Sequence, residues 1–393
     1  MRHYDNYWSN AMGRAEAMGR LRRLRQVKRL PGARIRIGQG PVLLDISSND
    51  YLGLSHHPCL SLAAQDYVAR FGAGSGASRL VTGNLVVFEE IERKLASGKA
   101  MEAALVFVSG VQANLTILPA LLDAKILGSK PLVYADRLNH ASLIQGCIAA
   151  GVRQIRFQHN DMEHLEELLK RDAGEDRPKF IITESVFSMD GDCPDLTKLT
   201  SLAEAFGAFL YIDEAHATGV LGTGGFGLAS GLKNALVVGT FSKGLGGFGA
   251  YAAGSVALRE YLINRCGGII YATALPPAVL GAMNAAIDLI PFMEAERSHI
   301  ARMASRLRSN LTLGGLNTGK STTQIVPVIL GEECRSLSLV AKLEKEGYYT
   351  VAIRPPTVPA GTSRLRLAVS SMHNQDEIDE ISKKIIQFAH ESC

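Results

Sequence analysis

The chain has 393 residues, of which 47% are hydrophobic and 20% charged, enough for a large buried core and a second, smaller domain. Its formal net charge of only +4 argues against nucleic acid as an obligate partner and suits an anionic small substrate. The first ten residues contain no apolar signal core, and no apolar run is long enough to cross a membrane. We therefore expect a cytoplasmic protein that needs neither membrane nor nucleic acid.

The six cysteines lie far apart, with no C-x-x-C pair and no cluster of histidines beside them. Disulfide frameworks are typical of small, cysteine-rich secreted chains, and zinc sites are typical of closely spaced pairs of Cys or His. We expect reduced core thiols and no metal site.

Residues 1–47 are predicted to form a basic helix and a hairpin. The helical pattern covers residues 9–30. Its basic side chains are Arg20, Arg22, Arg23, Arg25, Lys28 and Arg29. Either a solvated helix face or an arm that reaches anionic groups at a site would explain them. The runs Ile35–Ile37 and Val42–Ile46, separated by glycines, predict a short hairpin.

Residues 48–289 are predicted to form a large domain in which strands alternate with helices. Strands are expected at 103–108, 132–134, 154–157, 180–183, 209–212, 235–239 and 251–255. Helices are expected at 58–71, 87–96, 111–122, 142–150, 162–170 and 196–206. This alternation is typical of a mostly parallel, mixed sheet that is covered on both faces. Ligands of such sheets collect at the carboxyl ends of the strands, so the loops there should share one crevice.

Residues 290–393 are predicted to form a small α+β domain. A long amphipathic helix reaches residue 313 and precedes the strands 324–330, 349–353 and 364–369. Further helices are expected at 336–346 and 375–391.

Three stretches match nucleotide-binding motifs, but their surroundings oppose that function. Gly314–Ser321 fits the phosphate-loop pattern, and Asp213–His216 spells the signature box of a helicase class. A phosphate loop must follow a buried strand and open a helix, whereas this one follows a helix and leads into a strand. Gly244–Gly249 fits a dinucleotide fingerprint but is followed by a strand. A nucleotide-driven helicase stays a distant alternative.

Lys243 lies in a glycine-rich loop directly after the apolar strand at 235–239. A lysine held against apolar surroundings loses its proton more easily than one in water. This is what a lysine that forms a Schiff base with a carbonyl cofactor requires. The glycines would leave room for a flat ligand. The alternative is a solvated loop lysine.

Other strand ends supply what pyridoxal phosphate needs. Asp213 suits the pyridine nitrogen, although an aspartate at a strand end often only caps a helix. His140 suits the ring face, although a packing or capping histidine occupies the same kind of position. Ser109–Val111 opens a helix and so offers amides and a helix dipole to a phosphate. No one of these residues decides the function, but together they meet the needs of this cofactor.

Motifs along nearly the whole chain resemble the α-oxoamine synthase family of pyridoxal-phosphate enzymes. They are Ser48–Leu54, Gly72–Gly76, Ala135–Ser142, Glu184–Gly191, Asp213–Gly219, Thr240–Lys243 and Ala352–Arg366. The resemblance implies fold type I, an α/β fold with a mostly parallel, mixed seven-stranded sheet in the large domain and a smaller α+β C-terminal domain. The run Arg354–Thr357 resembles the corresponding segment of those family members that join L-alanine to a pimeloyl thioester in biotin biosynthesis.

The resemblance also implies roles for individual residues. Lys243, Asp213, His216 and His140 would be catalytic: Lys243 holds the cofactor, Asp213 and His216 bind its ring nitrogen and hydroxyl, and His140 stacks on the ring. Further cofactor contacts would come from Gly110, Val111, Ser188 and Thr240, with Thr273 reaching the phosphate of the neighbouring subunit in an obligate homodimer. The substrate-binding set would be Arg366 for the amino-acid carboxylate, His140, and Arg22, Asn49 and Thr357 beside the acyl substrate.

Sister enzymes remain an alternative, namely glycine C-acetyltransferase, 5-aminolevulinate synthase and serine palmitoyltransferase, or a plain aminotransferase. The sisters usually lack the Arg-Pro-Pro-Thr run. Val111, where relatives usually have an aromatic residue, and Ala217, where they often have glycine or serine, leave the acyl-chain preference open. The sequence also leaves open whether coenzyme A or a carrier protein bears the acyl group.

Overall fold

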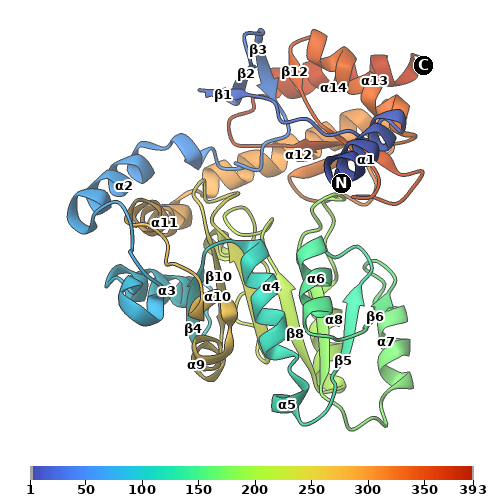
Figure 1. Cartoon of the computed structure of the whole chain (residues 1–393). Coiled ribbons are helices and arrows are strands. Elements are labelled where there is room, and N and C mark those ends of the chain that lie inside the picture. Colours follow the sequence, from blue (N-terminus) through green and yellow to red (C-terminus); the bar gives the residue numbers. More distant parts are fainter. Residues whose placement is uncertain (1–2, 392–393) are drawn as a thin grey trace. The chain divides into compact units, whose positions relative to one another are not determined.

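The computed structural model describes residues 3–391, which fall into two compact units (Figure 1). The large unit holds residues 49–188 and 192–299, and the small unit holds residues 3–48, 189–191 and 300–391. Cys393, one of the six cysteines, lies outside the described residues. The three-domain division drawn from the sequence stays a prediction.

The large unit is built on a seven-stranded sheet in the order β4-β10-β9-β8-β7-β5-β6. The strands are β4 Ala103–Phe107, β5 Leu132–Asp136, β6 Gln154–Phe157, β7 Lys179–Glu184, β8 Ala208–Asp213, β9 Ala235–Thr240 and β10 Ala250–Gly254. From β6 to β9 all neighbours are parallel, and β10 is antiparallel to both β9 and β4. The mostly parallel, mixed sheet predicted from the sequence is confirmed.

Helices cover both faces of this sheet, with α4 and α6 in front of the strands in Figure 1. The helices are α2 Pro58–Phe71, α3 Val87–Gly98, α4 Gly110–Leu121, α5 Ala124–Leu127, α6 Ala141–Ala149, α7 Met162–Arg171, α8 Leu196–Ala205, α9 Val256–Arg265, α10 Gly267–Ile270 and α11 Pro277–Leu289. Short turns of other helix types are η1 Leu54–His56, η2 Arg79–Gly83, η3 Thr223–Gly225 and η4 Ile290–Phe292. Along β8, Tyr211 packs into the core that includes α4 and α6, whereas Leu210 and Ile212 pack into the core that includes α7 and α8. This alternation is the pattern of a strand buried on both faces.

The small unit has two sheets around one core. The first, in the order β1-β2-β3-β12, consists of β1 Val27–Leu30, β2 Arg34–Ile37, β3 Val42–Asp45 and β12 Tyr348–Tyr349. The second, in the order β11-β14-β13, consists of β11 Ile325–Gly331, β14 Ser363–Ala368 and β13 Ala352–Ile353. The helices are α1 Asp5–Ala17, α13 Glu333–Lys345, α14 Gln375–His390 and α12 Glu294–Leu313, whose residues from Ile300 belong to this unit. Apolar side chains of α12, α13 and α14 pack with those of β11 and β14.

Three predicted elements are wrong in their extent. The N-terminal helix ends at Ala17, because Gly19 adopts a left-handed conformation (φ +64°), and residues 27–30 pair with β2 as strand β1. The helix predicted from residue 290 begins at Glu294, after the short turn Ile290–Phe292. The strand predicted at 349–353 consists of two separate two-residue strands.

Within residues 3–391, no single helix is long and apolar enough to cross a membrane. The bent pair Pro277–Phe292 and Glu294–Leu313 meets that criterion, by length and composition, only when both helices are counted together.

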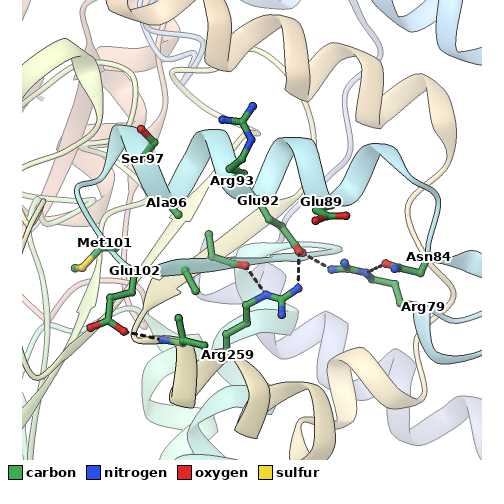
Figure 2. Close-up of a pocket in the computed structure, with 13 residues that line it drawn as sticks. Arg79, Asn84, Glu89, Glu92, Arg93, Ala96, Ser97, Met101, Glu102 and Arg259 are labelled. Carbon is green, nitrogen blue, oxygen red and sulfur yellow. Dashed lines mark hydrogen bonds and ion pairs between the residues drawn. The ribbon is translucent and has the colours of Figure 1, made fainter.

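Side chains close the outer edge of β4, the first strand in the sheet order. Glu92 accepts a hydrogen bond from the Val106 amide (2.9 Å), and Arg259 Nε donates to the Ala104 carbonyl (3.3 Å). Figure 2 shows Glu92 reaching from α3 toward both Arg79 and Arg259, with which it forms ion pairs. These contacts satisfy backbone groups that would otherwise be open to another strand.

We expect Glu92→Ala to destabilise the large unit by about 3–5 kcal/mol, because it leaves two guanidinium groups and the Val106 amide without this partner. Urea unfolding measures the loss. Glu89→Ala is the matched control, since Glu89 is an exposed side chain of the same helix and, like Glu92, lines the cavity beside β4 that is drawn in Figure 2. Its loss should stay below about 1 kcal/mol. Equal losses in the two variants would show that Glu92 has no special role at the edge.

A second charged cluster joins the segments after three strands. The ring of His159 bonds Asp136 Oδ1 through Nδ1 (3.0 Å) and Asp192 Oδ2 through Nε2 (2.9 Å). Burial alone would lower the pKa of His159, but hydrogen bonds from both carboxylates outweigh it and raise this pKa to about 10. The ring is therefore an imidazolium that donates both protons at neutral pH. It links the ends of β5 and β6 with the segment that follows β7.

Because the folded-state pKa of His159 is raised, its stabilisation should be fully present below about pH 6.5 and disappear as the pH rises through about 10. The difference in unfolding free energy between wild type and His159→Asn should be on the order of 4 kcal/mol at pH 6 and shrink toward pH 10. Urea unfolding at several pH values measures it. His56→Asn, at an exposed histidine of the same unit, should change stability by less than about 0.5 kcal/mol at each pH. A difference that does not vary with pH would contradict the charged clamp.

Candidate active site

A cavity of about 200 Å³ lies in the large unit, among the segments that follow β4, β5, β7, β8 and β9. Its lining includes seven residues predicted from the sequence: Gly110, Val111, His140, Asp213, His216, Thr240 and Lys243. The other lining residues are Ser109, Asn114, Ser142, Glu184, Ala215 and Ser242. The structure thus brings these strand ends together in one site.

The amine of Lys243 lies next to a histidine and, through it, a tyrosine. Lys243 Nζ is 2.8 Å from His216 Nε2, and the Tyr51 hydroxyl is 2.6 Å from His216 Nδ1. Tyr51 is fully buried and also donates to Asn49 Oδ1 (3.1 Å). The chain of contacts fixes the orientation of the imidazole and gives the amine a neighbour with which it can exchange a proton.

Asp213 is held as a carboxylate at the end of β8. Its Oδ2 accepts from Asn114 Nδ2 (2.8 Å), and its Oδ1 accepts from the Ala215 amide (2.9 Å). The Tyr211 hydroxyl donates to Asn114 Oδ1 (2.7 Å), which orients the amide so that its nitrogen faces Asp213. Asp213 is only 6% exposed. A fixed, buried anion of this kind can keep a heterocyclic nitrogen protonated.

His140 is the N-cap of α6, and its ring Nδ1 is 2.7 Å from Ser142 Oγ. Burial, above all, lowers the pKa of His140, with Lys243 acting in the same direction and Asp213 against it. The ring is therefore neutral at neutral pH and suited to packing against a flat aromatic ligand. His140 therefore both caps α6 and lines the cavity.

One side of the cavity is suited to an anion. Ser109 caps α4, so the amides of Gly110 and Val111 lie in a first helical turn, where intrahelical acceptors are lacking. The hydroxyls of Thr240 and Ser242 lie 2.6 Å apart on the same lining. Amides, hydroxyls and the helix dipole together favour a phosphate group.

The segment from Asp213 to His216 is anchored by a buried ion pair. Lys99 Nζ lies 2.5 Å from Glu214 Oε2, and both side chains are fully buried. Glu214 Oε1 also accepts from the amides of Leu228 (2.6 Å) and Ala229 (2.8 Å). Glu214 thus fixes the backbone between the two predicted cofactor ligands.

The glycines of the lysine loop were predicted to leave room for a flat ligand. That prediction is wrong. A Cβ at Gly246 would come within 2.4 Å of the Leu54–Ser55 backbone, and one at Gly249 within 2.2 Å of Met283. None of the glycines between residues 244 and 249 lines the cavity. They let the loop pack closely on its neighbours, which fixes Lys243 in place.

Six predicted site residues lie outside the cavity lining. Ser188 is half-buried in the segment after β7, Asn49 meets the cavity only through Tyr51, and Thr273 is exposed and forms a bridge with Ser78. The other three belong to the small unit: Arg22, Thr357 and Arg366. Arg22 and Thr357 are exposed, and Arg366 is buried on β14.

Four residues that shape the site were given no individual role from the sequence: Tyr51, Asn114, Ser142 and Glu184, although Glu184 was expected at the crevice. Glu184 had a usable signal, because it is a carboxylate at the carboxyl end of a predicted strand. Asn114 was also detectable as a polar residue on the predicted helix after Ser109. Tyr51 and Ser142 act through contacts that only the fold creates.

The donor set fits pyridoxal phosphate. An amine, a fixed carboxylate, a neutral imidazole and an anion-binding helix start face one cavity, and each matches one part of that cofactor. Among the described residues, no group of three or more His, Cys, Asp or Glu is placed to hold a metal ion.

Comparisons with known proteins agree with this site. The aminotransferase class I and II family model matches residues 41–385. The 8-amino-7-oxononanoate synthase of Gluconacetobacter diazotrophicus is 54% identical over 355 residues, which cover 90% of this chain and 89% of that protein.

Two solved structures confirm the fold. A serine palmitoyltransferase variant from S. paucimobilis, with a bound PLP–myriocin aldimine, has a TM-score of 0.90 at 25% identity and covers 98% of both chains. The 8-amino-7-oxononanoate synthase of Francisella tularensis has a TM-score of 0.76 at 26% identity, over 88% of this chain and 97% of that one. The chain therefore belongs to the aminotransferase class I and II family, within which it is similar to proteins named 8-amino-7-oxononanoate synthase.

Proposed function

We propose that this chain is an acyltransferase of biotin biosynthesis that uses pyridoxal phosphate. It condenses L-alanine with a pimeloyl thioester and releases 8-amino-7-oxononanoate, carbon dioxide and the free thiol. The observation that carries the proposal is the convergence of Lys243, Asp213, His216 and His140 on one cavity. The 54% identity to a protein named for this reaction supports the choice of substrates.

When bound, the cofactor supplies a protonated aromatic ring that takes up negative charge from the substrate Cα. Lys243 would hold the cofactor through its side-chain amine and would move the proton at the substrate Cα. His216 Nε2 lies 2.8 Å from this amine, where it can share that proton, and His216 would bind the ring hydroxyl of the cofactor. Asp213 keeps the ring nitrogen protonated, and neutral His140 covers the ring face.

The roles of the predicted site residues outside the cavity lining follow from the resemblance. Arg366 binds the L-alanine carboxylate through a guanidinium, whose fork matches a carboxylate. Arg22, Asn49 and Thr357 border the acyl group. A basic arm suits an anionic donor, whether the thiol belongs to coenzyme A or to a carrier protein. Ser188 would help Thr240 to hold the cofactor.

A homodimer with shared sites is part of the proposal. The large unit exposes several large apolar side chains, among them Val81 (73% exposed), Val111 (49%) and Tyr271 (86%). A second copy would cover such a surface and explain it. Val111 also lines the cavity, and Thr273 lies two residues from Tyr271. In such a dimer Thr273 would help to hold the cofactor phosphate of the other subunit.

The substrate test follows thiol release from pimeloyl-CoA and from a pimeloyl carrier protein, with L-alanine, glycine or L-serine as the second substrate. We expect L-alanine to give a kcat/KM at least about tenfold above the others, since a fitted apolar pocket discriminates by about 10- to 200-fold against a missing methyl group, as in glycine, and by about 100-fold against an added hydroxyl, as in L-serine. A clear preference for glycine or serine would favour a sister enzyme, which the serine palmitoyltransferase structure shows to have the same fold. A colourless protein that hydrolyses ATP would overturn the class of enzyme altogether.

Lys243→Ala should leave a folded protein that binds pyridoxal phosphate without covalent attachment and loses at least about 10³-fold in kcat, because proton transfer at Cα loses its base. Borohydride treatment followed by mass spectrometry should fix the cofactor on the wild type and not on the variant. The matched control is Lys233→Ala, at an exposed lysine of the same unit, which should keep both properties. Retained turnover in Lys243→Ala would refute the proposed mechanism.

A further inference from the structure

Two carboxylates end neighbouring strands at the floor of the cavity. Glu184 is the last residue of β7 and Asp213 the last of β8, and the parallel register pairs them directly. Both line the cavity, and they are 3% and 6% exposed. Burying two like charges on adjacent strand ends is unfavourable without compensating donors, and the charge of Asp213 raises the pKa of Glu184.

The donors around the pair are distributed unequally. Both oxygens of Asp213 have a fixed donor, Asn114 Nδ2 for Oδ2 and the Ala215 amide for Oδ1. Tyr211 donates to Asn114 Oδ1 and Ser142 Oγ accepts from Asn114 Nδ2 (2.9 Å), which supports the orientation in which the Asn114 N–H group faces Asp213. For Glu184 the donor is the amide of His140, which lies 2.6 Å from Oε1. The architecture therefore favours the anion at Asp213.

The charged groups that face Glu184 act in opposite directions. Burial, above all, raises the pKa of Glu184 well above its usual range, and the charges of Asp213 on β8 and Asp136 on β5 add to this. The amide of His140 and the amine of Lys243 lower the pKa, but they do not outweigh the burial. The His140 ring is neutral at neutral pH and adds no positive charge.

We propose that Glu184 carries a proton at neutral pH and acts as a neutral positioning residue at the floor of the site. The carbonyl oxygen of its side-chain carboxyl group accepts a hydrogen bond from the backbone amide of His140. Because Glu184 is neutral, Asp213 is the single anionic carboxylate next to the ring nitrogen. An ionised Glu184 would instead place a second negative charge there. It would compete for the proton that Asp213 keeps on the ring and would repel a substrate carboxylate.

The first test does not depend on the cofactor. Infrared spectroscopy of the full-length chain freed of cofactor should show the C=O band of a protonated carboxylic acid at pH 7. This band should be absent from Glu184→Gln. In Asp213→Asn the band should persist and titrate at lower pH than in the wild type, because a neighbouring negative charge has been removed. Absence of the band from the wild type, or its survival in Glu184→Gln, would overturn the proposal. Asp213→Asn keeps the test decisive if Glu184→Gln does not fold.

The second test rests on the proposed cofactor site and uses two variants with the same chemical change on adjacent strands. Pyridoxal phosphate binding is measured by titration of the cofactor-free chain, followed by its absorbance. Glu184→Gln keeps a neutral group that accepts from His140, so the dissociation constant should rise less than about threefold. Asp213→Asn removes the negative charge next to the ring nitrogen and should raise the dissociation constant at least about tenfold. A rise in Glu184→Gln equal to that in Asp213→Asn would show that Glu184 acts as an anion. No binding to the wild type would refute the cofactor assignment, while the infrared result would still stand.

Discussion

One fully buried ion pair, Lys99–Glu214, holds the segment on which the candidate site depends. Burial alone would lower the pKa of Lys99, but Tyr251 and Glu214 outweigh it and raise this pKa, so the lysine stays charged. Lys99 also donates to the Phe226 carbonyl (2.5 Å), and Glu214 accepts two backbone amides. A buried pair of charges is costly unless its remaining donors and acceptors are satisfied in this way. Its value here is positional, because Glu214 directly follows Asp213.

Burial and neighbouring charges also decide the protonation states of three other groups in the large unit, with a different outcome for each. His159 lies between two carboxylates and is charged, which ties together the segments after three strands. His140 lies near one lysine and one aspartate, and burial leaves it neutral. Glu184 receives one amide and lies beside an anion, so its neutral form is favoured. Each protonation state thus follows from the number of donors and charges that the strand ends bring to each group.

The sequence predicted the architecture well where the pattern is local. The helix 58–71 and the strand 154–157 have the predicted bounds, because apolar periodicity and flanking turn residues are properties of the segment itself. The residues that end parallel strands were also placed together correctly, since the topology dictates it. The N-terminal helix was overextended because basic residues after Gly19 suit a helix as well as a strand. Only the partner strand β2 decides between them.

Parts of the site depend on distant contacts, which a pattern does not contain. Tyr51 approaches His216 across 165 residues, and Asn114 approaches Asp213 across 99. The glycines after Lys243 were interpreted as space for a ligand, whereas they allow close packing against residues 54–55 and Met283. A glycine pattern indicates that something comes close, but it does not say whether that is a ligand or another part of the chain.

The four residues Asp213-Glu-Ala-His216 show how context decides the meaning of a motif. In this fold Asp213 faces the cavity at a strand end, and Glu214 turns away to the buried lysine. Ala215 supplies an amide to Asp213, and His216 lies between a tyrosine and a lysine amine. A nucleotide-driven motor would need a phosphate loop that follows a strand and opens a helix. Residues 314–321 instead follow α12 and lead into β11. The same four letters therefore serve a different chemistry, because Glu214 is held in the buried ion pair while Asp213 and His216 both line the cavity.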